Sequence, residues 1–562
     1  MNKDNMDPIF GSDPLEVVST DPEMCTDVQS VGEDKTFRIL VSDKLGEKGI
    51  RMLRDEPGIE VDVNTGLAPE ELLEIIGDYD GLIIRSATKV TEQILEKAEN
   101  LKVVGRAGIG LDNVDIPVAT SRGVAVMNTP KGNVVTTAEH AISMLMALTR
   151  NIPRGTASMK AGRWDKKLLQ GREVMNKNLG LIGYGKIGSV VADRARGLRM
   201  NVLVYDPVVP REKIEKDGHK PVDLDELYAQ ADYISIHVPK GKKTLNLLNK
   251  AAFDKMKEGV MIINCARGGI VNEQDLHDAL TSGKVAGAAL DVFETEPPGE
   301  HPLFELDNVV ATPHLGASTR EAQTNVAVQV AEQMIKYLKD NTAVNTVNVP
   351  QISGKVLEKL APFLTLGERM GLLLSQIIEG HIKAVEIEYI GDIHQQDMSP
   401  VTTSILTGLL SPLASDEVNF VNAPSLAKQM GIKISEATSA ESYDYSNLIR
   451  VTVKTEKKDT VVAGTLFGKN YPRIVGIDML RLEMIPAGYF AILEGNDDPG
   501  SIGNIGSLLG KKDINIARMT VGQDVDGTRN KIFIRTDEPM PRQVVEELQD
   551  LTTVNAIHTF EL

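Results

Sequence analysis

The stretch "NLGLIGYGKIG", residues 178–188, joins a short apolar run to a glycine-rich turn. Gly183, Gly185 and Gly188 have the spacing G-x-G-x-x-G, and the apolar run before them is typical of a buried strand. The first glycine allows a tight turn, the second lets the backbone approach a phosphate, and the third lets the next helix pack on the strand. The stretch therefore predicts a nucleotide-binding turn in an α/β fold, with the anion at the helix N-terminus.

Apolar runs of strand length recur on both sides of this turn, separated by stretches with helical periodicity. After the turn they are "NVLVYD" (201–206), "YISIHVP" (233–239), "VMIINCA" (260–266), "GAALDVF" (287–293) and "NVVATPH" (308–314). Before it they are "FRILVSD" (37–43), "IEVDV" (59–63) and "GLIIR" (81–85). Strands that alternate with helices predict an α/β class, with parallel sheets covered by helices on both faces.

Two long helices are expected where these two series meet. In "TTAEHAISMLMALTRN", Thr136 and Glu139 have the spacing of a capping box ahead of an apolar helical pattern. Ser318 and Glu321 have the same spacing, and they predict the start of a second helix that runs to about Leu338.

An acid at the end of the strand after the turn indicates which nucleotide is bound. Asp206 ends "NVLVYD", 23 positions after Gly183. A carboxylate there accepts hydrogen bonds from the ribose hydroxyls of NAD and repels the 2′-phosphate of NADP. No arginine directly follows Asp206, although Arg211 is close by. We therefore expect NAD as the cofactor.

Three residues that suit hydride-transfer chemistry lie just after predicted strands: Arg267, Glu296 and His314. A histidine near neutral pKa accepts the proton of a substrate hydroxyl, and a carboxylate behind it fixes its tautomer. An arginine grips a substrate carboxylate in a two-pronged hydrogen bond. Each residue alone has a structural explanation, but the three together at sheet ends predict an active site.

The composition limits the other classes of function. A length of 562 residues suggests three or four domains of roughly 150 residues. The net charge, 61 − 79 = −18, argues against nucleic-acid binding. Two cysteines, Cys25 and Cys265, are too few for a disulfide framework and lack metal-ligand spacing, so we expect no metal and a cytoplasmic location. No apolar run approaches the ~18 residues of a membrane helix.

The two ends of the chain differ from its α/β part. Residues 1–36 carry nine acids and two lysines, which predicts a disordered acidic leader without the character of a targeting signal. Residues 341–354 are a linker by composition, and an amphipathic helix and a mixed β/α segment to about residue 485 follow. Residues 488–562 are expected to run strand, helix, strand, strand, helix, strand, the ferredoxin-like order.

Several segments resemble a known family. "NCARGGIVNEQDL", "GAALDVFETEPP" and "TPHLGAST" are similar to the signature segments of the D-isomer-specific 2-hydroxyacid dehydrogenases. The matching positions of that family carry the substrate arginine (Arg267), the acid that orients the histidine (Glu296) and the acid–base residue (His314). The NAD site assigned with it comprises the three glycines, Asp206, Lys186, Ile187, Cys265, Asp291 and Gly316. One departure is Ile109 in "RAGIG", where the family often has a threonine that hydrogen-bonds near the cofactor.

The resemblance also implies the domain order. A flavodoxin-like substrate domain would comprise residues 37–130 and 316–345, and a Rossmann-type NAD domain, 131–315, would be inserted between them. This insertion explains why the glycine turn comes so late in the chain. Residues 351–485 resemble the α+β intervening domain of long members of the family, and 488–562 resemble an ACT domain with a ferredoxin-like fold.

The substrate expected from the resemblance is phosphorylated. "RSATKVT", "GRAGIGLDNVD" and "TPKGNVVTTAEH" are similar to the family members that act on 3-phosphoglycerate. Arg85 and Arg106 match positions that face the substrate in those enzymes. We therefore expect an oligomeric enzyme, a dimer or tetramer, that oxidises D-3-phosphoglycerate to 3-phosphooxypyruvate as the first step of serine synthesis.

The ACT segment suggests regulation. "DDPGSIG" places backbone N–H groups at a helix start, where an amino-acid carboxylate binds readily. Asp497 and Asn515 match positions that hold effector serine in regulated relatives. Gly495 stands where those relatives often have a larger residue, so a domain that only dimerises is the competing interpretation.

The sequence is also consistent with two other functions. One is a different D-2-hydroxyacid dehydrogenase, acting on glyoxylate or a D-lactate-like acid. The other is an NAD-sensing, corepressor-like binding protein that keeps the site but has little turnover. A formate-oxidising relative would carry glutamine in place of Glu296.

Overall fold

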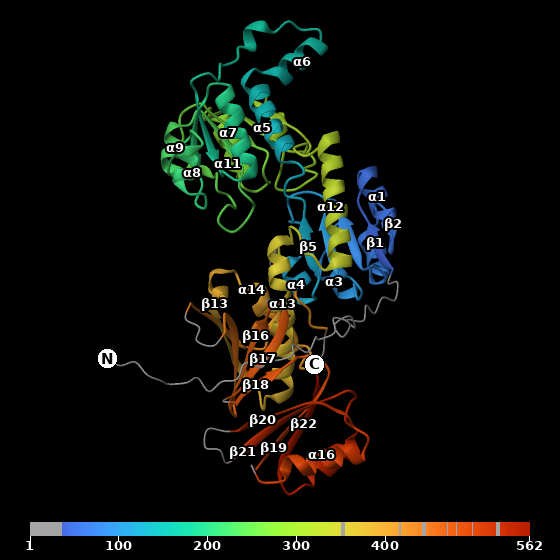
Figure 1. The fold of residues 1–562 in the computed structure, drawn as a ribbon. Coiled ribbons are helices and arrows are strands. Elements are labelled where there is room, and N and C mark those ends of the chain that lie inside the picture. The colour runs from blue at the N-terminus through green and yellow to red at the C-terminus, as the bar shows by residue number, and fades with distance from the viewer. Residues whose placement is uncertain are drawn as a thin grey trace, which may run out of the picture.

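The computed structural model describes residues 36–349, 354–414, 417–440, 445–468, 470–478, 480–496, 498–523 and 529–562, and these residues form four sheets. Figure 1 shows the sheet of the glycine turn at one end of an elongated molecule and the ferredoxin-like sheet at the other. The remaining two sheets lie between them. Residues 1–35 of the predicted leader lie outside the described part.

The nucleotide lobe is built on a seven-stranded parallel sheet of order β12-β11-β10-β9-β6-β7-β8. Its strands are β6 (Asn178–Ile182), β7 (Asn201–Tyr205), β8 (Lys220–Pro221), β9 (Tyr233–Ile236), β10 (Val260–Asn264), β11 (Val285–Leu290) and β12 (Val309–Ala311). Alternate side chains of a strand point to opposite faces, so helices cover both. One face packs on α5 (Val134–Thr149) and α7 (Lys186–Gly197), and the other on α9 (Leu224–Gln230), α10 (Lys250–Lys255) and α11 (Glu273–Thr281). The remaining helices of the lobe are α6 (Ile152–Lys160), η3 (Lys166–Leu168), α8 (Arg211–Lys216) and η4 (Pro302–Glu305).

The first lobe carries a five-stranded parallel sheet of order β2-β1-β3-β4-β5, which is the flavodoxin-like order. Its strands are β1 (Phe37–Val41), β2 (Ile59–Val63), β3 (Gly81–Ile84), β4 (Val103–Arg106) and β5 (Ala125–Asn128). One face packs on α1 (Glu47–Arg54) and on the distant helix α12 (Arg320–Asp340). The other packs on α2 (Pro69–Ile75), α3 (Glu92–Lys97) and α4 (Ile116–Ser121), and the short helix η2 (Ile76–Asp78) follows α2. A helix from beyond the nucleotide lobe thus completes the core of this lobe.

The crossing of α1 and α12 is tight enough to exclude a side chain. A Cβ at Gly49 would lie 2.4 Å from the carbonyl oxygen of Ala327 on α12. We expect Gly49→Ala to destabilise the protein by about 1–3 kcal/mol, because backbone atoms must move apart. Unfolding monitored by circular dichroism would show this as a lower apparent Tm.

A matched control for that substitution lies on an open helix face. A Cβ at Gly506 in α16 (Ser501–Lys511) would have no atom within 4 Å. Gly506→Ala should therefore keep or raise the apparent Tm, because alanine favours a helix by about 1 kcal/mol over glycine. An unchanged Tm in Gly49→Ala would show that the two helices can separate without cost.

The intervening domain is a six-stranded mixed sheet, order β14-β13-β15-β16-β17-β18, packed on two long helices. Its elements are α13 (Gly354–Ile377), β13 (Ile382–Gly391), η5 (Asp392–Gln395), α14 (Ser399–Leu410), α15 (Ala423–Gln429), β14 (Lys433–Ser439), β15 (Asn447–Thr455), β16 (Asp459–Phe467), β17 (Tyr471–Ile477) and β18 (Leu480–Met484). The amphipathic helix predicted after the linker is α13. The intervening domain also reaches the first lobe, where the Asn419 amide donates to the Gly123 carbonyl at 3.0 Å.

The ACT domain is a four-stranded antiparallel sheet of order β20-β21-β19-β22. It follows the predicted ferredoxin-like sequence of β19 (Tyr489–Asn496), α16, β20 (Ile516–Gln523), β21 (Arg529–Thr536), α17 (Arg542–Gln549) and β22 (Val554–Glu561). Ala491 and Leu493 face its helices, whereas Phe490 and Ile492 join the core of the intervening domain. One face of the ACT sheet therefore shares the core of the intervening domain, and the other face forms a core with the ACT helices.

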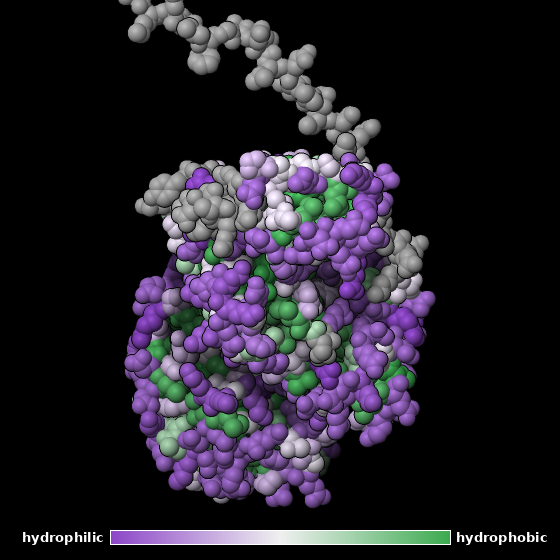
Figure 2. All heavy atoms as spheres, turned by 90° about the horizontal axis from the view of Figure 1, so that it is seen from below, coloured by the Kyte–Doolittle hydropathy of each residue, from purple (hydrophilic) through white to green (hydrophobic). Residues whose placement is uncertain are grey.

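The outer surface at the ACT end is mostly hydrophilic, with scattered hydrophobic patches (Figure 2). No helix in the described ranges is both long and apolar enough to cross a membrane.

Both predicted capping boxes are wrong in detail. Helix α5 begins at Val134, so Thr136 lies inside its first turn, and the N-cap Asn133 makes no side-chain cap. Helix α12 is capped by Thr319, whose hydroxyl accepts the N–H of Ala322 at 3.1 Å, and not by Ser318. Residues three apart lie together anywhere on a helix, so this spacing alone does not identify the first residue.

Candidate active site

The three predicted catalytic residues follow three neighbouring strands. Arg267 follows β10, Glu296 follows β11 and His314 follows β12, and these strands are adjacent and parallel. Their carboxyl ends therefore meet at one edge of the sheet. His314 Nδ1 lies 2.7 Å from Glu296 Oε2, and Glu296 Oε1 accepts the backbone N–H of Phe293 at 3.1 Å. The carboxylate holds the proton of His314 on Nδ1, which leaves Nε2 as the nitrogen that can accept one.

The environment keeps Glu296 ionised. Partial burial raises the pKa of Glu296, but the hydrogen bonds from His314 and the Phe293 N–H outweigh burial and hold this pKa below its usual range. A carboxylate that stays charged stabilises the imidazolium that forms when His314 takes a proton.

A buried aspartate shapes the loop that carries His314. His314 has a left-handed backbone, with φ of 53°, and its N–H donates to the carbonyl of Asp291 at 3.0 Å. The fully buried carboxylate of Asp291 accepts the N–H of Leu315 at 2.7 Å and that of Gly316 at 2.8 Å. Left-handed backbone is costly for a residue other than glycine. The Asp291 contacts hold the loop in this conformation.

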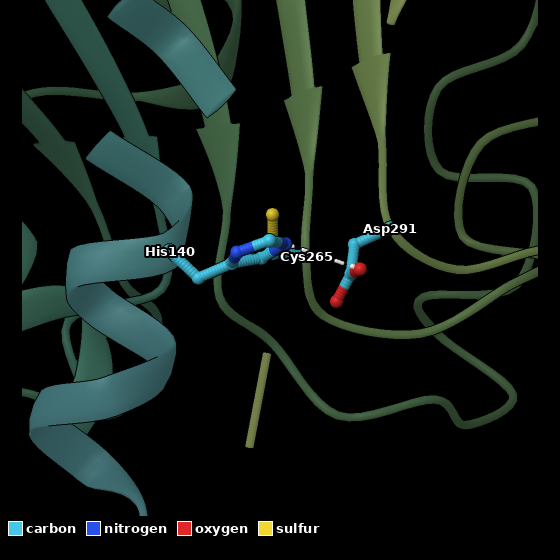
Figure 3. Close-up of side chains that lie close together, drawn as sticks. All are labelled: His140, Cys265 and Asp291. Carbon is cyan, nitrogen blue, oxygen red and sulfur yellow. Dashed lines mark ion pairs between the residues drawn. The ribbon is translucent and has the colours of Figure 1, made fainter. Parts of the chain in front are cut away.

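A histidine on α5 completes this network. His140 Nε2 lies 3.1 Å from Asp291 Oδ1 and 3.3 Å from the hydroxyl of Thr312, which itself donates to Asp291 at 2.5 Å. Figure 3 shows His140 directed toward Asp291, with the sulfur of Cys265 beside them. Burial raises the pKa of the Cys265 thiol, so the sulfur stays protonated. The cluster has the residue types of a metal site. However, both Asp291 oxygens already bind backbone N–H groups, and the contacts are those of a hydrogen-bond network.

Arg267 reaches across to the first lobe. Its Nε donates to Asp112 Oδ2 at 2.9 Å, and Asp112 lies in the loop between β4 and α4. One terminal nitrogen also donates to the carbonyl of Ala266 at 2.7 Å. This ion pair brings Arg267 of the nucleotide lobe against the loop that follows β4 in the first lobe.

Of the two arginines predicted to face the substrate, Arg85 follows β3 and Arg106 is the last residue of β4, and these two strands are adjacent. The Arg106 guanidinium lies over Gly108, where a Cβ would be 1.9 Å from it. Burial, together with the charges of Arg267 and Arg85, lowers the pKa of Arg106 to about 10. Arg106 therefore remains cationic at neutral pH, and the three guanidinium groups lie near one another where the two lobes meet.

The glycine turn has the backbone shape expected for a dinucleotide site. Gly183 has φ of 100°, and a Cβ there would lie 2.6 Å from the carbonyl oxygen of His237. A Cβ at Gly188 would lie 2.2 Å from the Gly183 carbonyl oxygen, so the helix packs directly on the turn. Gly185, the residue before α7, has no atom within 4 Å of its Cβ position. This open space beside a helix N-terminus fits a pyrophosphate.

Asp206 braces the same turn. One carboxylate oxygen accepts the N–H of Tyr184 at 2.6 Å, and the other accepts those of Val208 and Val209 at 2.8 and 2.9 Å. Burial raises the pKa of Asp206, but these three N–H groups hold it below its usual range. A charged carboxylate at this strand end suits the ribose hydroxyls of NAD.

The remaining predicted cofactor residues lie around this turn or around the His314 loop. Lys186 and Ile187 are the first two residues of α7, after Gly185. Cys265, Asp291 and Gly316 belong to the buried network beside His314. The structure thus groups the predicted NAD residues along the carboxyl edge of one sheet.

One of the two predicted effector residues can be described. The Asn515 amide donates to Asp537 Oδ2 at 2.7 Å, next to β20 of the ACT domain. Asp497 lies outside the described residues. Helix α16 begins at Ser501, after Gly500 with φ of 95°, so the predicted strand–turn–helix is present.

Sequence reasoning missed two residues of this site. It gave Asp112 no role, although an acid six positions after Arg106 in a glycine-rich loop was a usable signal. It also assigned no role to His140, which contacts Asp291 and Thr312. Both partnerships join segments far apart in the chain.

The sequence matches three known protein-family models and several named relatives. The model of the D-isomer specific 2-hydroxyacid dehydrogenase NAD-binding domain matches residues 142–316. The D-3-phosphoglycerate dehydrogenase intervening domain matches 359–478, and the ACT domain matches 490–553. D-3-phosphoglycerate dehydrogenase of Archaeoglobus fulgidus is 43% identical over 518 residues, which are 92% of this chain and 98% of the relative. The enzyme of that name from Bacillus subtilis is 40% identical over 527 residues, covering 94% and 100%.

The chain belongs to the D-3-phosphoglycerate dehydrogenase family. The match to the NAD-binding domain confirms NAD as the predicted cofactor and the chain as an NAD-dependent oxidoreductase. Solved structures share the dehydrogenase fold of this family member. An NAD-dependent formate dehydrogenase from Staphylococcus aureus in complex with NAD matches with a TM-score of 0.51 and 29% identity over 56% of this chain and 99% of that one. A glyoxylate reductase from Paecilomyes thermophila matches with a TM-score of 0.52 and 28% identity, over 56% and 98%.

Asp206 gives this family member a testable cofactor preference. We expect Asp206→Ala to weaken NADH binding about 10- to 100-fold, because it removes a ribose acceptor and a brace of the turn. NADPH binding should weaken less or improve, since the negative charge that repels the 2′-phosphate is gone. Titrations of NADH and NADPH fluorescence would give both dissociation constants.

Asp217 provides the control for that variant. Its carboxylate accepts a hydrogen bond from the Tyr184 hydroxyl at 3.1 Å. Asp217 therefore contacts the same residue of the glycine turn as Asp206. Asp217→Asn should leave the NADH-to-NADPH preference unchanged. The same preference in Asp206→Ala and the unmodified protein would contradict the ribose role of Asp206.

Proposed function

We propose that the protein oxidises D-3-phosphoglycerate to 3-phosphooxypyruvate with NAD, as the first step of serine synthesis. The observation that carries this proposal is the proximity of Arg85, Arg106 and Arg267, and Arg267 also follows the strand next to the one that precedes Glu296. A 2-hydroxyacid with a phosphate carries two anionic groups, and a set of three guanidinium groups can bind both. The names of the relatives support the same substrate.

The His314–Glu296 pair supplies the acid–base chemistry of this reaction. His314 Nε2 accepts the proton of the substrate hydroxyl, because Nδ1 is engaged by Glu296 at 2.7 Å. Glu296 stabilises the resulting imidazolium by its negative charge. When bound, NAD accepts the hydride from the carbon that bears this hydroxyl. In the reverse direction His314 returns the proton to the carbonyl oxygen.

In this proposal the three arginines bind different anionic groups of the substrate. Arg267 binds the carboxylate next to the reacting carbon, and Arg85 and Arg106 bind the phosphate. NAD is held by Gly183, Gly185, Gly188 and Asp206, with Lys186, Ile187, Cys265, Asp291 and Gly316 completing its site. Closure of the two lobes would then exclude water from the hydride-transfer step.

The domain division is part of the same proposal. The substrate domain comprises residues 37–130 and 316–345, the NAD domain 131–315, the intervening domain 351–485 and the ACT domain 488–562. The packing of α12 on the first sheet supports the discontinuous substrate domain.

Exposed apolar side chains indicate that the protein forms an oligomer. We propose a homo-oligomer, a dimer or tetramer, because Trp164 and Leu168 of the segment after α6 are 79% and 74% exposed. The ACT domain would bind an amino-acid effector, with L-serine as the first candidate, near Asn515 and Asp497. We propose the cytoplasm as the location of the protein, because a chain with only two cysteines suits a reducing compartment.

A comparison of 2-oxoacids tests the proposed substrate. Purified protein with NADH should reduce 3-phosphooxypyruvate with a kcat/KM at least ~100-fold above that for 3-hydroxypyruvate, because only the former engages Arg85 and Arg106. Glyoxylate, which also lacks the phosphate, should be no better than 3-hydroxypyruvate. Equal kcat/KM values for the three acids would contradict a phosphate site. NADH binding without any turnover would favour the sensor protein instead.

A further inference from the structure

The ion pair between Asp112 and Arg267 connects the two lobes at the candidate active site. Arg267 follows β10 of the nucleotide lobe, and Asp112 lies between β4 and α4 of the first lobe, 155 positions earlier in the chain. The Nε–Oδ2 distance is 2.9 Å, and the Arg267 and Asp112 side chains are 28% and 56% exposed. A partly exposed ion pair adds little stability by itself. Its geometry therefore matters more than its strength.

The absence of a side chain at Gly110 leaves room for the Arg267 guanidinium. A Cβ at Gly110 would lie 1.9 Å from the Nη2 atom of Arg267 and 2.9 Å from the Asp112 carboxylate. No residue larger than glycine fits there without moving this pair. The guanidinium thus lies close against the loop that carries Asp112.

Hydrogen bonds from the end of β5 in the first lobe hold the same loop in place. The Asn128 amide donates to the Ile109 carbonyl at 2.6 Å, and the Thr129 N–H donates to the Gly108 carbonyl at 3.0 Å. Asp112 is therefore presented by a held loop. A side chain on such a loop can orient its partner.

The two contacts of Arg267 leave its terminal nitrogens able to donate. A guanidinium has five N–H bonds, and Asp112 takes the one on Nε while the Ala266 carbonyl takes one on Nη1. Three N–H bonds remain on Nη1 and Nη2, and one from each nitrogen can grip a carboxylate with two parallel hydrogen bonds. Asp112 thus occupies the Nε side of Arg267 and leaves both terminal nitrogens able to donate to a second carboxylate.

Asp112 also offsets part of the positive charge of the nearby arginines. Arg85, Arg106 and Arg267 repel one another, and among the charges that act on Arg106 the opposing ones are Asp112 and Asp43. Asp43 is occupied by the N–H groups of Arg85 and Thr88. Asp112 is the acid that pairs directly with one of the three guanidinium groups.

We propose that Asp112 is a positioning residue that holds the Nε side of Arg267 and aims its terminal nitrogens at the carboxylate of the 2-oxoacid or 2-hydroxyacid. This inference rests on the proposed role of Arg267 in substrate binding. It predicts that Asp112 stays paired with Arg267 during turnover and strengthens substrate binding. The opposite arrangement, in which the Asp112 carboxylate occupies Arg267 until the substrate displaces it, predicts tighter substrate binding when Asp112 is removed.

The sign of the change in KM decides between these two arrangements. We expect Asp112→Ala to raise the KM for the 2-oxoacid about 10- to 100-fold, while the KM for NADH changes by less than about twofold. Asp112→Asn keeps an acceptor for the Nε–H but loses the charge, so its KM should fall between those of Asp112→Ala and the unmodified protein. A lowered or unchanged 2-oxoacid KM in both variants would overturn the proposal.

A neighbouring acid separates positioning from folding. Asp115 caps α4 by accepting the N–H of Val118 at 3.2 Å and has no contact with Arg267. Asp115→Asn should lower the apparent Tm without a selective change in the 2-oxoacid KM. If Asp112→Asn behaved in the same way, its role would be structural and the proposal would fail.

The choice of substrate keeps this test independent of the proposed function. Every 2-oxoacid has the carboxylate that Arg267 would bind, so the KM shift is measured with whichever of 3-phosphooxypyruvate, 3-hydroxypyruvate and glyoxylate the unmodified protein reduces. Failure of 3-phosphooxypyruvate alone would count against the proposed substrate. Failure of the KM shift with a working substrate would count against Asp112.

Discussion

Replacing His314 with glutamine should lower kcat by about 100- to 10,000-fold while NADH still binds. The amide can occupy the same space and can hydrogen-bond to Glu296, but it cannot take a proton from the substrate hydroxyl at neutral pH. The glycine turn and Asp206 are untouched, so the dissociation constant for NADH should change by less than about threefold. Stopped-flow or steady-state NADH absorbance and a fluorescence titration would measure the two quantities.

A histidine outside the site serves as the control for this variant. His277 lies on α11 and contacts Asp278, its neighbour in sequence, at 3.4 Å. His277→Gln should keep kcat within about twofold. Equal kcat in His314→Gln and the unmodified protein would remove the acid–base role of His314, whatever the substrate.

Replacing Arg267 with lysine should lower kcat/KM by about 30- to 1,000-fold although the positive charge is kept. Lysine is a point charge and has no planar edge to form two parallel hydrogen bonds with a carboxylate. Loss of a partner from a hydrogen-bonded charge pair typically costs about 2–5 kcal/mol, and each 1.4 kcal/mol is about tenfold. Initial rates of NADH loss over a range of 2-oxoacid concentrations would give the ratio.

An exposed arginine provides the matched substitution. Arg163 pairs with Asp165 at 3.0 Å in the segment after α6. Arg163→Lys should leave kcat/KM unchanged. If Arg267→Lys also left kcat/KM unchanged, a two-pronged grip on the substrate carboxylate would not be part of the mechanism.

Much of the fold could be predicted because its strands are local apolar runs. The runs ending at Asp206 and His314 became β7 and β12, because buried parallel strands require continuous apolar sequence. Strand β8 could not be predicted, since it is two residues long and contains Pro221. The helix starts were off by one or more residues because the capping spacing also occurs inside helices.

The site was predictable where chemistry follows a strand end. Arg267 and Glu296 come within three positions after predicted strands and His314 ends a third, and parallel strands bring their carboxyl ends together. Asp112 and His140 were missed because their roles depend on partners 155 and 151 positions away, and no local pattern encodes such a pairing. The shared core of the intervening and ACT domains was missed for the same reason, since Phe490 alternates like any strand residue.

The most direct measurement mixes the purified full chain with NADH and 3-phosphooxypyruvate, follows NADH absorbance, and identifies the product. The account predicts rapid loss of NADH, with one D-3-phosphoglycerate formed for each NADH consumed, and little loss in the His314→Gln variant. Loss of NADH that does not depend on His314, or no loss at all while NADH still binds, would contradict the central claim.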